Sequence, residues 1–420
     1  MLKDRADSKV VEKCQICSSE KLQSVLFLGY LPPVNKMRKI GERPKEESAY
    51  PAELLSCPDC GLVQLGLIVS PKILFPAEYP YTSSTTKILR DNFAELYTEC
   101  SGILKLGKDD LVVDIGSNDG NLLSNFKDKH RVLGITPEDI GKIAIGRGIP
   151  TVLDYFRAES VEKVLKEYGR PSLVTATNVF AHIDDVNEIV SLIIGMLDKD
   201  GVFISESHYL LPLIEDLQFD TVYHEHLRYY SLHALKNLFE RHGLEIFHAK
   251  RIPTHGGSIR VYTARKGMRK VGESVKKLMS AEKKVVTEKA SLDKFRMDVE
   301  KAKLSMMKLL GGIFESGKKI YGISAPSRAS TLINYCAIDD AVMECVLEIK
   351  GSHKIGYYVP GTLIPILEET KLFEDQPEYA MIFSWHIAEE LIPKLKAKGF
   401  KGDFIVPLPV PRIIKNSQAG

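Results

Sequence analysis

The stretch 111–123 constrains the fold of this chain more than any other segment. A short apolar run ends at Asp114, Gly116 and Gly120 bracket the loop that follows, and apolar residues from Leu122 onward predict a helix. A strand that runs into a glycine loop and then a helix brings backbone close to a ligand in α/β folds. Glycine suits such a loop because a Cβ atom would block the approach. The stretch therefore predicts an α/β fold with a ligand site at this loop.

Two cofactor classes use such a loop. The dinucleotide fingerprint requires G-x-G-x-x-G with an acidic residue about 20 positions further on. Here Asn118 stands at the second glycine position and Asn121 follows Gly120, so the fingerprint fails. An acid at the end of the first strand with a G-x-x-x-G loop fits enzymes of S-adenosylmethionine (SAM) better. A glycine turn without any ligand remains the alternative from the loop alone.

Strands alternate with helices after this loop. Further strands are predicted at 131–135, 150–153, 172–178 and 201–205, with helices at 140–146, 159–168 and 185–197. This alternation predicts a doubly wound parallel sheet. Ligands of such sheets bind at the carboxyl ends of the strands. Those ends carry Asp114, Thr136, Asn178 and Glu206.

Length and composition limit the classes of protein that this chain can belong to. A chain of 420 residues suits two or three domains. The net charge of +2 gives no reason to expect a nucleic-acid partner. No apolar run reaches 18 residues, and the first residues lack the apolar stretch of a signal peptide. We expect a cytoplasmic protein that does not bind membranes, and a monomer, because no long apolar seam calls for a partner.

Four of the seven cysteines form two Cys-x-x-Cys pairs, Cys14/Cys17 and Cys57/Cys60. In a reducing compartment such pairs favour a metal over disulfides, and a redox motif would need only one pair. Four thiolates suit a closed tetrahedral zinc ion, which is structural rather than catalytic. Cys100, Cys336 and Cys345 are scattered, and we expect them to be small buried residues.

The chain divides into four predicted parts. Residues 1–75 form the zinc module, and 76–265 form the SAM-dependent methyltransferase domain. Residues 266–318 are charged with one apolar helical face, which predicts a helical connector. Residues 319–420 repeat the pattern of strand, small-residue loop and helix, so a second, smaller Rossmann-like α/β domain is expected.

Tyr223-His-Glu-His-Leu-Arg-Tyr-Tyr-Ser231 concentrates groups that transfer protons. With this stretch the sequence resembles the sugar-nucleotide C-methyltransferases, which add methyl groups to nucleotide-linked (dTDP-type) keto-deoxysugars. The resemblance runs over nearly the whole chain. It includes the four cysteines, Asp114-Ile-Gly-Ser-Asn-Asp-Gly120, Asn178-Val-Phe-Ala-His-Ile183, His255-Gly-Gly-Ser258 and the closing Rossmann-like domain. It implies SAM and structural zinc as cofactors and a nucleotide sugar as substrate.

The chain departs from that family at three places. The family usually has an acid at the end of the second strand to hold the SAM ribose, where this chain has Thr136, and Glu138 is a possible substitute. In the last domain Arg328 replaces a usual lysine and His386 a usual asparagine, whereas Lys354 is kept. These changes bear on which sugar and which nucleotide are bound.

Carbon methylation requires a base at the carbon next to the ketone and stabilisation of the enolate oxygen. We predict His226 as the base, since imidazole titrates near working pH. Glu225 would orient or polarise His226, and Tyr223 would donate to the enolate oxygen. The predicted SAM-binding residues are Asp114, Gly116, Asn118, Gly120, Thr136, Glu138 and Asn178. The predicted substrate-binding residues are Tyr79, Tyr81, His182, His224, His255, Arg328 and Lys354.

Three alternatives stay open from the sequence. The histidine-glutamate stretch could be a hydrogen-bonded network that braces a domain junction. An O- or N-methyltransferase on a sugar or other small metabolite would use the same fold and would not need to stabilise an enolate. A non-catalytic interaction module with a degenerate SAM fold would bind SAM weakly.

Overall fold

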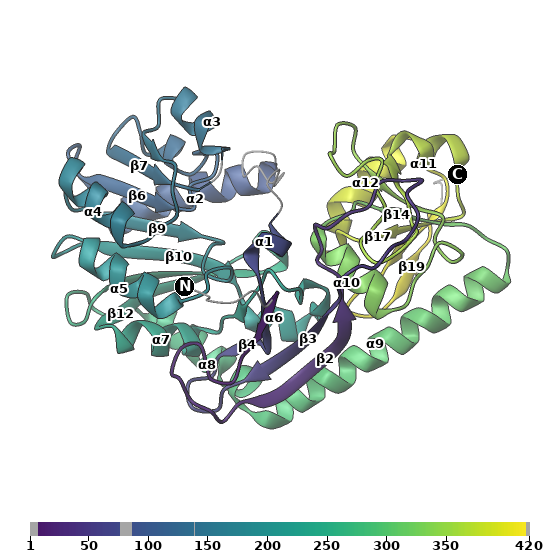
Figure 1. Cartoon of the computed structure of the whole chain (residues 1–420), viewed down its shortest axis with the longest axis horizontal. Coiled ribbons are helices and arrows are strands. Elements are labelled where there is room, and N and C mark those ends of the chain that lie inside the picture. The colour runs from purple at the N-terminus through teal and green to yellow at the C-terminus, as the bar shows by residue number, and fades with distance from the viewer. Residues whose placement is uncertain (1–6, 76–85, 138, 417–420) are drawn as a thin grey trace.

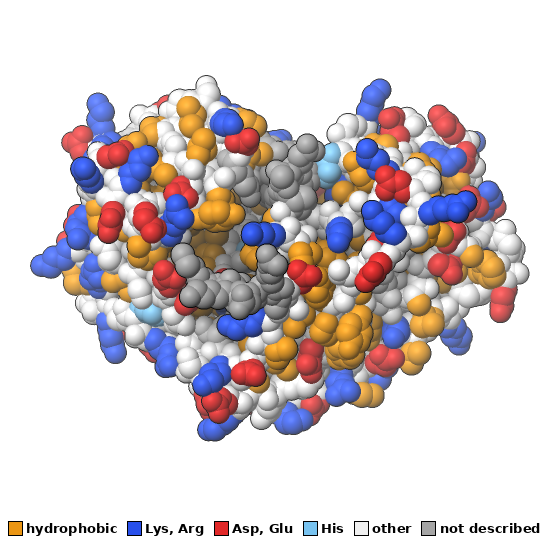
Figure 2. Space-filling view, viewed as in Figure 1, with side chains coloured by type: hydrophobic (Ala, Val, Ile, Leu, Met, Phe, Trp, Pro, Cys, Tyr) orange, Lys and Arg blue, Asp and Glu red, His pale blue; other side chains and the backbone are white. Residues whose placement is uncertain are grey.

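The structure is a computed structural model that describes residues 7–75, 86–137 and 139–416. Two α/β lobes lie side by side, and the long helix α9 (Lys289–Glu315) runs beneath the C-terminal lobe (Figure 1). A small sheet from the N-terminal module lies between and below the two lobes. A notch separates the lobes along one edge of the surface, which carries acidic and basic side chains intermixed (Figure 2). None of the described helices is both long and apolar enough to cross a membrane.

The larger sheet belongs to the N-terminal lobe. Its strands are β6 (Leu111–Ile115), β7 (Arg131–Ile135), β8 (Thr151–Val152), β9 (Leu173–Thr177), β10 (Val202–His208), β12 (Leu244–Ile252) and β13 (Ser258–Arg265). They lie in the order β12-β13-β10-β9-β6-β7-β8. The five strands from β10 to β8 are parallel, as predicted, and the hairpin of β12 and β13 adds an antiparallel edge. The chain changes direction across the sheet between β6 and β9, which is where such folds bind ligands.

Helices accompany this sheet. They are α2 (Lys87–Ile103), α3 (Gly141–Gly146), α4 (Ala158–Glu167), α5 (Val186–Met196), α6 (Leu210–Glu215) and α7 (Leu232–Arg241). The five residues of β6 are all buried, as expected of a strand covered on both faces. Asp185 directly precedes helix α5, and its carboxylate accepts a hydrogen bond from the amide of Glu188 at 3.0 Å and so caps the helix.

The prediction of a helix from Leu122 onward is wrong. Only a single 3-10 turn, Leu123–Asn125, follows the glycine loop. Ser124 Oγ and Asn125 Nδ2 donate to the carbonyl of Asn121 at 2.7 and 3.1 Å. These side chains therefore occupy an acceptor that an α-helix would offer to a backbone amide.

The N-terminal module takes one strand from the methyltransferase region. Its own elements are β1 (Ser8–Val10), β2 (Gln23–Leu31), β3 (Tyr50–Ser56), β4 (Val63–Leu65), β5 (Leu67–Val69) and α1 (Pro71–Leu74). Its four-stranded sheet has the order β11-β4-β3-β2, in which β11 (Arg228–Tyr229) comes from far along the chain. In this pairing Arg228 lies opposite Gln64 and Tyr229 opposite Val63. The module's sheet is thus completed by the strand that directly follows the predicted catalytic residues.

Two helices connect the lobes. Helix α8 (Glu273–Thr287) packs against α9, whose apolar face points to the core. Its buried positions are Leu292, Phe295, Val299, Ala302, Met306, Leu310 and Ile313.

The C-terminal lobe contains the second α/β sheet. Its strands are β14 (Ile320–Ile323), β15 (Cys345–Glu348), β16 (Ile366–Glu368), β17 (Tyr379–Ile382), β18 (Asp403–Val406) and β19 (Arg412–Ile414). Its helices are α10 (Ser327–Tyr335), α11 (Thr370–Asp375) and α12 (Ala388–Ala397). The order is β16-β15-β14-β17-β18-β19, and all strands but β19 are parallel. Strand order reverses between β14 and β17, so this sheet has a second crevice of the kind that binds ligands.

Candidate active site and zinc centre

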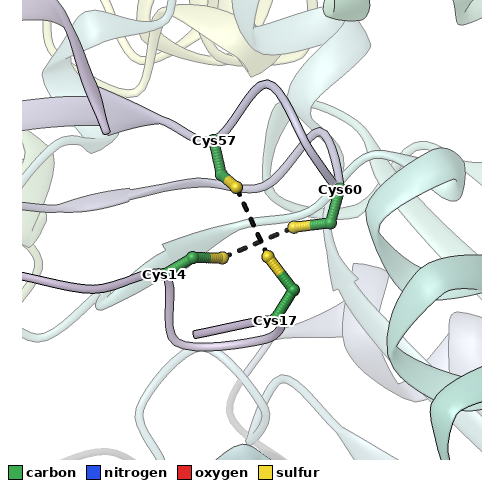
Figure 3. A group of neighbouring side chains, drawn as sticks. All are labelled: Cys14, Cys17, Cys57 and Cys60. Atoms are coloured by element: carbon green, nitrogen blue, oxygen red, sulfur yellow. Dashed lines mark hydrogen bonds between the residues drawn. The ribbon is translucent and has the colours of Figure 1, made fainter. Parts of the chain in front are cut away.

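Four cysteine side chains from two turns point toward one centre (Figure 3). The sulfur atoms of Cys14, Cys17, Cys57 and Cys60 all lie within 4.8 Å of one another. Sγ of Cys14 lies 3.4 Å from Sγ of Cys60, and Sγ of Cys17 lies 3.5 Å from Sγ of Cys57. These distances are too long for disulfides, and they are near the edge of a tetrahedron with Zn–S bonds of about 2.3 Å. The donor set fits a structural zinc ion, as predicted.

The zinc centre is attached to the helices of the larger sheet. Asn237 Nδ2 on α7 donates to the carbonyl of Cys60 at 3.1 Å, and Arg241 Nη2 donates to that of Cys17 at 3.2 Å. Asn187 Nδ2 on α5 donates to the carbonyl of Gln15 at 2.9 Å. The metal-binding turns therefore help to fix the position of the module on the methyltransferase lobe.

The glycine loop has the backbone that a close ligand requires. Gly116 and Gly120 have φ of +72° and +77°, and an added Cβ atom would lie 2.5 Å from Val179 Cγ2 or 2.8 Å from Ile149 Cδ1, respectively. Asn118 between them also has positive φ, at +52°, which asparagine tolerates better than most residues. The residue that breaks the dinucleotide fingerprint thus still adopts the left-handed backbone of a glycine.

Two buried polar atoms at this crevice have no partner among the described residues. They are Ser117 Oγ, after β6, and Asn178 Oδ1, after β9. Buried polar atoms are nearly always hydrogen-bonded, so an orphan in a crevice indicates a missing partner. The amino acid, ribose and adenine groups of SAM carry many such partners, and the loop fits SAM on this ground.

The predicted acid Asp114 and its neighbour strand complete the crevice. Asp114 is buried, its Oδ1 accepts the hydroxyl of Thr175 at 2.6 Å, and burial raises its pKa to about 7. Thr136 is buried at the end of β7, so a short neutral side chain stands where the resemblance leads one to expect an acid. Glu138, the predicted substitute, lies outside the described residues.

Glu206, also predicted at this edge, belongs to a structural network. Its Oε1 accepts Arg260 Nε at 2.6 Å, and its Oε2 accepts Asn92 Nδ2 at 2.9 Å. Arg260 Nη1 also donates to Glu95 and Glu99 of α2, each at 2.7 Å. This network ties α2 to the edge hairpin of the sheet.

Four histidines gather beside the SAM crevice, with the buried His226 in the middle and the partly buried His182, His208 and His255 around it. Its ring centre lies 4.8 Å from that of His208 and 5.1 Å from that of His182, and His255 stacks on His208 at 5.4 Å. Tyr223 covers another side of the His226 ring, with centres 4.2 Å apart. The structure therefore brings together Tyr223, His182, His226 and His255 from three separate segments of the predicted site.

The hydrogen bond of His226 determines where its proton lies. The Nδ1 atom lies 3.0 Å from the carbonyl oxygen of Thr221, which can only accept. Nδ1 therefore carries the proton in the neutral ring, and Nε2 has a free lone pair. Burial, followed by the repulsion that two protons on neighbouring rings such as His226 and His182 would exert on each other, holds the pKa of His226 well below its ordinary value. The ring is neutral and able to accept a proton at neutral pH.

Comparisons with known proteins identify the family. A C-methyltransferase C-terminal domain matches residues 253–409, a methyltransferase domain matches 86–249, and a zinc binding domain of the same group matches 14–75. The C-methyltransferase NovU of Streptomyces niveus is 30% identical over 409 residues, which cover 96% of this chain and 97% of NovU. The chain belongs to this C-methyltransferase family. It is a SAM-dependent C-methyltransferase with a zinc-binding module, as predicted.

Solved structures resemble only part of the chain. Magnesium protoporphyrin IX methyltransferase from Synechocystis, with bound SAH, is 11% identical and covers 42% of this chain and 83% of its own, with a TM-score of 0.33. The PH0226 protein of Pyrococcus horikoshii is 14% identical and covers 47% of this chain and 97% of its own, with a TM-score of 0.36.

The other residues predicted for the active site of the C-methyltransferase lie in different surroundings. Glu225 Oε1 accepts Asn35 Nδ2 of the zinc module at 2.5 Å. His224 also contacts the module, through its Nε2 at 3.2 Å from the carbonyl of Pro51 and its ring beside Tyr50. Its described contacts are thus with the module rather than with the other histidines.

Two residues predicted to bind substrate come from the C-terminal lobe. Arg328 is buried and donates to Asp220, whereas Lys354 donates to the carbonyl of Ala325, with Glu225 and Glu348 nearby. Burial lowers the pKa of Lys354. Tyr79 and Tyr81 lie outside the described residues. Phe75, just before them, packs its ring 6.1 Å from that of His182.

His208 is a member of the histidine cluster that the sequence analysis missed. The fifth strand was predicted to end at 205, but β10 continues to His208. Its pairing with β13 places His208 opposite Ser258, beside the His-Gly-Gly-Ser loop. The polar run Ser205-Glu-Ser-His208 could have indicated this, because alternate residues of a strand share a face and a longer strand would place His208 on the same face as Glu206.

Proposed function

We propose that this C-methyltransferase adds a methyl group to the carbon next to the ketone of a nucleotide-linked keto-deoxysugar. The observation that carries the proposal is the hydrogen bond from Nδ1 of His226 to the carbonyl of Thr221. It leaves Nε2 of a buried, neutral imidazole as a proton acceptor beside the SAM crevice. A carbon acid requires such an acceptor, since its hydrogen must be removed before the carbon can attack.

The surroundings of His226 suit an anionic substrate. His182, His208 and His255 are partly buried, and loss of hydration lowers the pKa of His182 and of His255 to about 4 and holds the pKa of His208 well below its ordinary value, so the three rings are neutral at pH 7. Arg328 lies close enough to repel a proton on His226. A diphosphate nearby would offset this repulsion and raise the basicity of the cluster. The free base would thus become effective when a nucleotide sugar is bound.

The proposed step balances as follows. Nε2 of His226 takes the proton from the α-carbon, and the electron pair moves to the ketone oxygen, where the phenol of Tyr223 donates a hydrogen bond. SAM, when bound, would supply a methyl group on a sulfonium that needs no activation: the S–CH3 bond would break and its electron pair would stay on the sulfur of S-adenosylhomocysteine. The α-carbon forms the new bond, the ketone is restored, and His226 loses its proton to solvent. Glu225, which accepts a hydrogen bond from Asn35, would orient or polarise His226.

Proton exchange in deuterated buffer tests this proposal. The enzyme with S-adenosylhomocysteine is offered nucleotide-4-keto-6-deoxysugars, beginning with dTDP-4-keto-6-deoxyglucose. We expect a mass gain of one deuteron at the α-carbon, reduced roughly 10²–10⁴-fold in His226→Gln. His130→Gln, at a partly exposed histidine outside the cluster, is the matched control. Methyl transfer to an oxygen or nitrogen of any substrate, without carbon exchange, would overturn the proposal in favour of heteroatom methylation.

A further inference from the structure

Asp220 receives three hydrogen bonds from the C-terminal lobe. It is 1% exposed and lies in the turn η3 (Phe219–Thr221), which belongs to the methyltransferase region. Arg328 Nε donates to its Oδ2 and Arg328 Nη2 to its Oδ1, both at 2.8 Å. Trp385 Nε1 also donates to Oδ2 at 2.8 Å. The pair is a buried, two-pronged ion pair between segments 108 residues apart.

The same turn carries the carbonyl that holds the proton of His226. Thr221 directly follows Asp220, and its carbonyl oxygen accepts Nδ1 of His226 at 3.0 Å. The next carbonyl, of Val222, accepts Thr331 Oγ1 of α10 at 3.2 Å. Phe219 packs its ring 5.2 Å from Tyr335 at the end of α10. Helix α10 therefore contacts the turn on both sides of Thr221, at Phe219 and at Val222.

We propose that Arg328 is a positioning residue, which acts through Asp220 to hold the Thr221 carbonyl and so keeps the proton of His226 on Nδ1. This inference rests on the proposed role of His226 as the base. A shift of the turn would break the hydrogen bond and let the ring rotate or carry its proton on Nε2, where it could not accept another. The C-terminal lobe thus contributes to the chemistry through the placement of the base.

This role differs from the substrate-binding role that the sequence suggested for Arg328. Nε and Nη2 are bound to Asp220, and Nη1 lies 2.9 Å from Nδ1 of His386. The planar guanidinium stacks on Trp385, 5.0 Å from the ring centre. A diphosphate could take the fork of Arg328 only by displacing Asp220, which would be left as a buried carboxylate without a counter-ion.

Kinetics of exchange and the tautomer of His226 test the inference. The variants are Arg328→Gln, Arg328→Lys, Asp220→Asn and the double variant Arg328→Gln/Asp220→Asn, each checked for zinc content and thermal unfolding. The probe is dTDP-4-keto-6-deoxyglucose with S-adenosylhomocysteine bound. We expect Arg328→Gln to lower kcat for exchange roughly 10²-fold with KM within about threefold of wild type. We expect the double variant to be no slower than either single variant, because the two residues act as one unit.

Nitrogen-15 NMR of labelled histidines gives a second readout that needs no substrate. The His226 signal, assigned by its loss in His226→Gln, should report a proton on Nδ1 in the wild type and a mixture in Arg328→Gln. Arg328→Lys, which keeps the charge but loses the fork, should restore the tautomer in part.

Two results would overturn the inference. One is a KM raised tenfold or more by Arg328→Gln with kcat unchanged, which would make Arg328 a ligand of the substrate. The other is an unchanged His226 tautomer in both Arg328→Gln and Asp220→Asn. Absence of exchange in the wild type counts against the proposed function instead, and the substrate-free tautomer still decides the role of Arg328.

Discussion

The two α/β sheets of this C-methyltransferase have equivalent crevices with different contents. In the first, at the ends of β6 and β9, Ser117 Oγ and Asn178 Oδ1 are buried without partners among the described residues. In the second, at the ends of β14 and β17, Ser324 Oγ lies 2.7 Å from Ser384 Oγ, and the fork of Arg328 binds Asp220. One crevice keeps polar atoms free for a ligand, whereas the other uses them for internal bonds.

This difference indicates what each crevice contributes. Free, buried polar atoms and glycines with positive φ prepare the first crevice for a cofactor. The internal bonds of the second crevice join it to the turn that supports His226. The same topological position thus serves binding in one lobe and positioning in the other.

Removal of zinc should have the largest effect, and it should lower proton exchange at the histidine cluster much more than it weakens SAM binding at the first crevice. The zinc module pairs its β4 with β11, two residues after His226, whereas the glycine loop lies on the larger sheet itself. Structural zinc supplies much of the folding energy of small modules. We expect Cys57→Ser with chelation to lower α-proton exchange by more than about 10²-fold, since the base would be misplaced.

Calorimetry of SAM binding is the control for this experiment. The dissociation constant for SAM should change by less than about threefold, because the glycine loop contacts none of the four cysteines. Equal losses of SAM binding and exchange would contradict the separation. The zinc content of Cys57→Ser should fall from one ion per chain to none. Cys100→Ser, at a buried cysteine outside the zinc site, is the control variant and should keep its zinc.

Gly116→Ala should damage the first crevice alone. The new Cβ would lie 2.5 Å from Val179 Cγ2, and alanine is strained at φ of +72°. We expect the dissociation constant for SAM to rise by roughly 10-fold or more, equivalent to about 1.4 kcal/mol, as measured by calorimetry. Gly195→Ala, in α5 with no atom within 4 Å of the added Cβ, should bind SAM like the wild type.

The cluster of neutral histidines between the crevices should make stability depend on pH. The pKa of His182 falls from 6.5 to about 4 on folding, because burial penalises its charge. Only the unfolded chain then binds this proton between about pH 6.5 and 4, so the free energy of unfolding falls as pH falls through this window. The slope from one such group is about 1.4 kcal/mol per pH unit.

Urea unfolding between pH 7 and 5.5 measures this slope. His182→Gln should remove about 1.4 kcal/mol per pH unit relative to the wild type below pH 6.5. The difference in slope between His182→Gln and the wild type cancels the contributions of other groups to the pH dependence of unfolding. One of these is Asp114, whose pKa is raised to about 7 and whose contribution has the opposite sign. An unchanged slope in His182→Gln would mean that the folded protein also binds a proton at His182 in this pH range.

The local patterns of the sequence predicted most of the fold. Alternating strands and helices gave the parallel sheet, because strand and helix periodicities differ, and the spacing of four cysteines gave the zinc centre. Asn118 shows the limit of such reasoning, since this residue breaks the dinucleotide fingerprint and still adopts the positive φ of a glycine. The prediction of a helix after Gly120 was wrong because the side chains of Ser124 and Asn125 compete with backbone amides for the Asn121 carbonyl.

Contacts between distant segments could not be predicted in this way. The pairing of β11 with β4 and the bond between Asp220 and Arg328 join residues more than a hundred positions apart. No periodicity encodes such pairs. From the sequence, Arg328 was therefore predicted to bind the substrate, and its bond to Asp220 could not be foreseen. Candidate catalytic residues could be named from their chemistry, but the residues that hold them in place could not.

Trp385→Phe should give the smallest effect, and it separates the hydrogen bonds of the second crevice from its packing. The substitution removes the bond from Nε1 to Asp220 Oδ2 while an aromatic ring remains beneath the guanidinium of Arg328. A hydrogen bond to a charged group contributes about 1.5–3 kcal/mol, but two bonds from Arg328 still hold the carboxylate. We therefore expect kcat for exchange to fall by only about 3- to 10-fold, with KM for the nucleotide sugar and the dissociation constant for SAM unchanged. A loss as large as that in Arg328→Gln would mean that Trp385, rather than the ion pair, holds the turn. No loss at all would mean that the fork of Arg328 suffices.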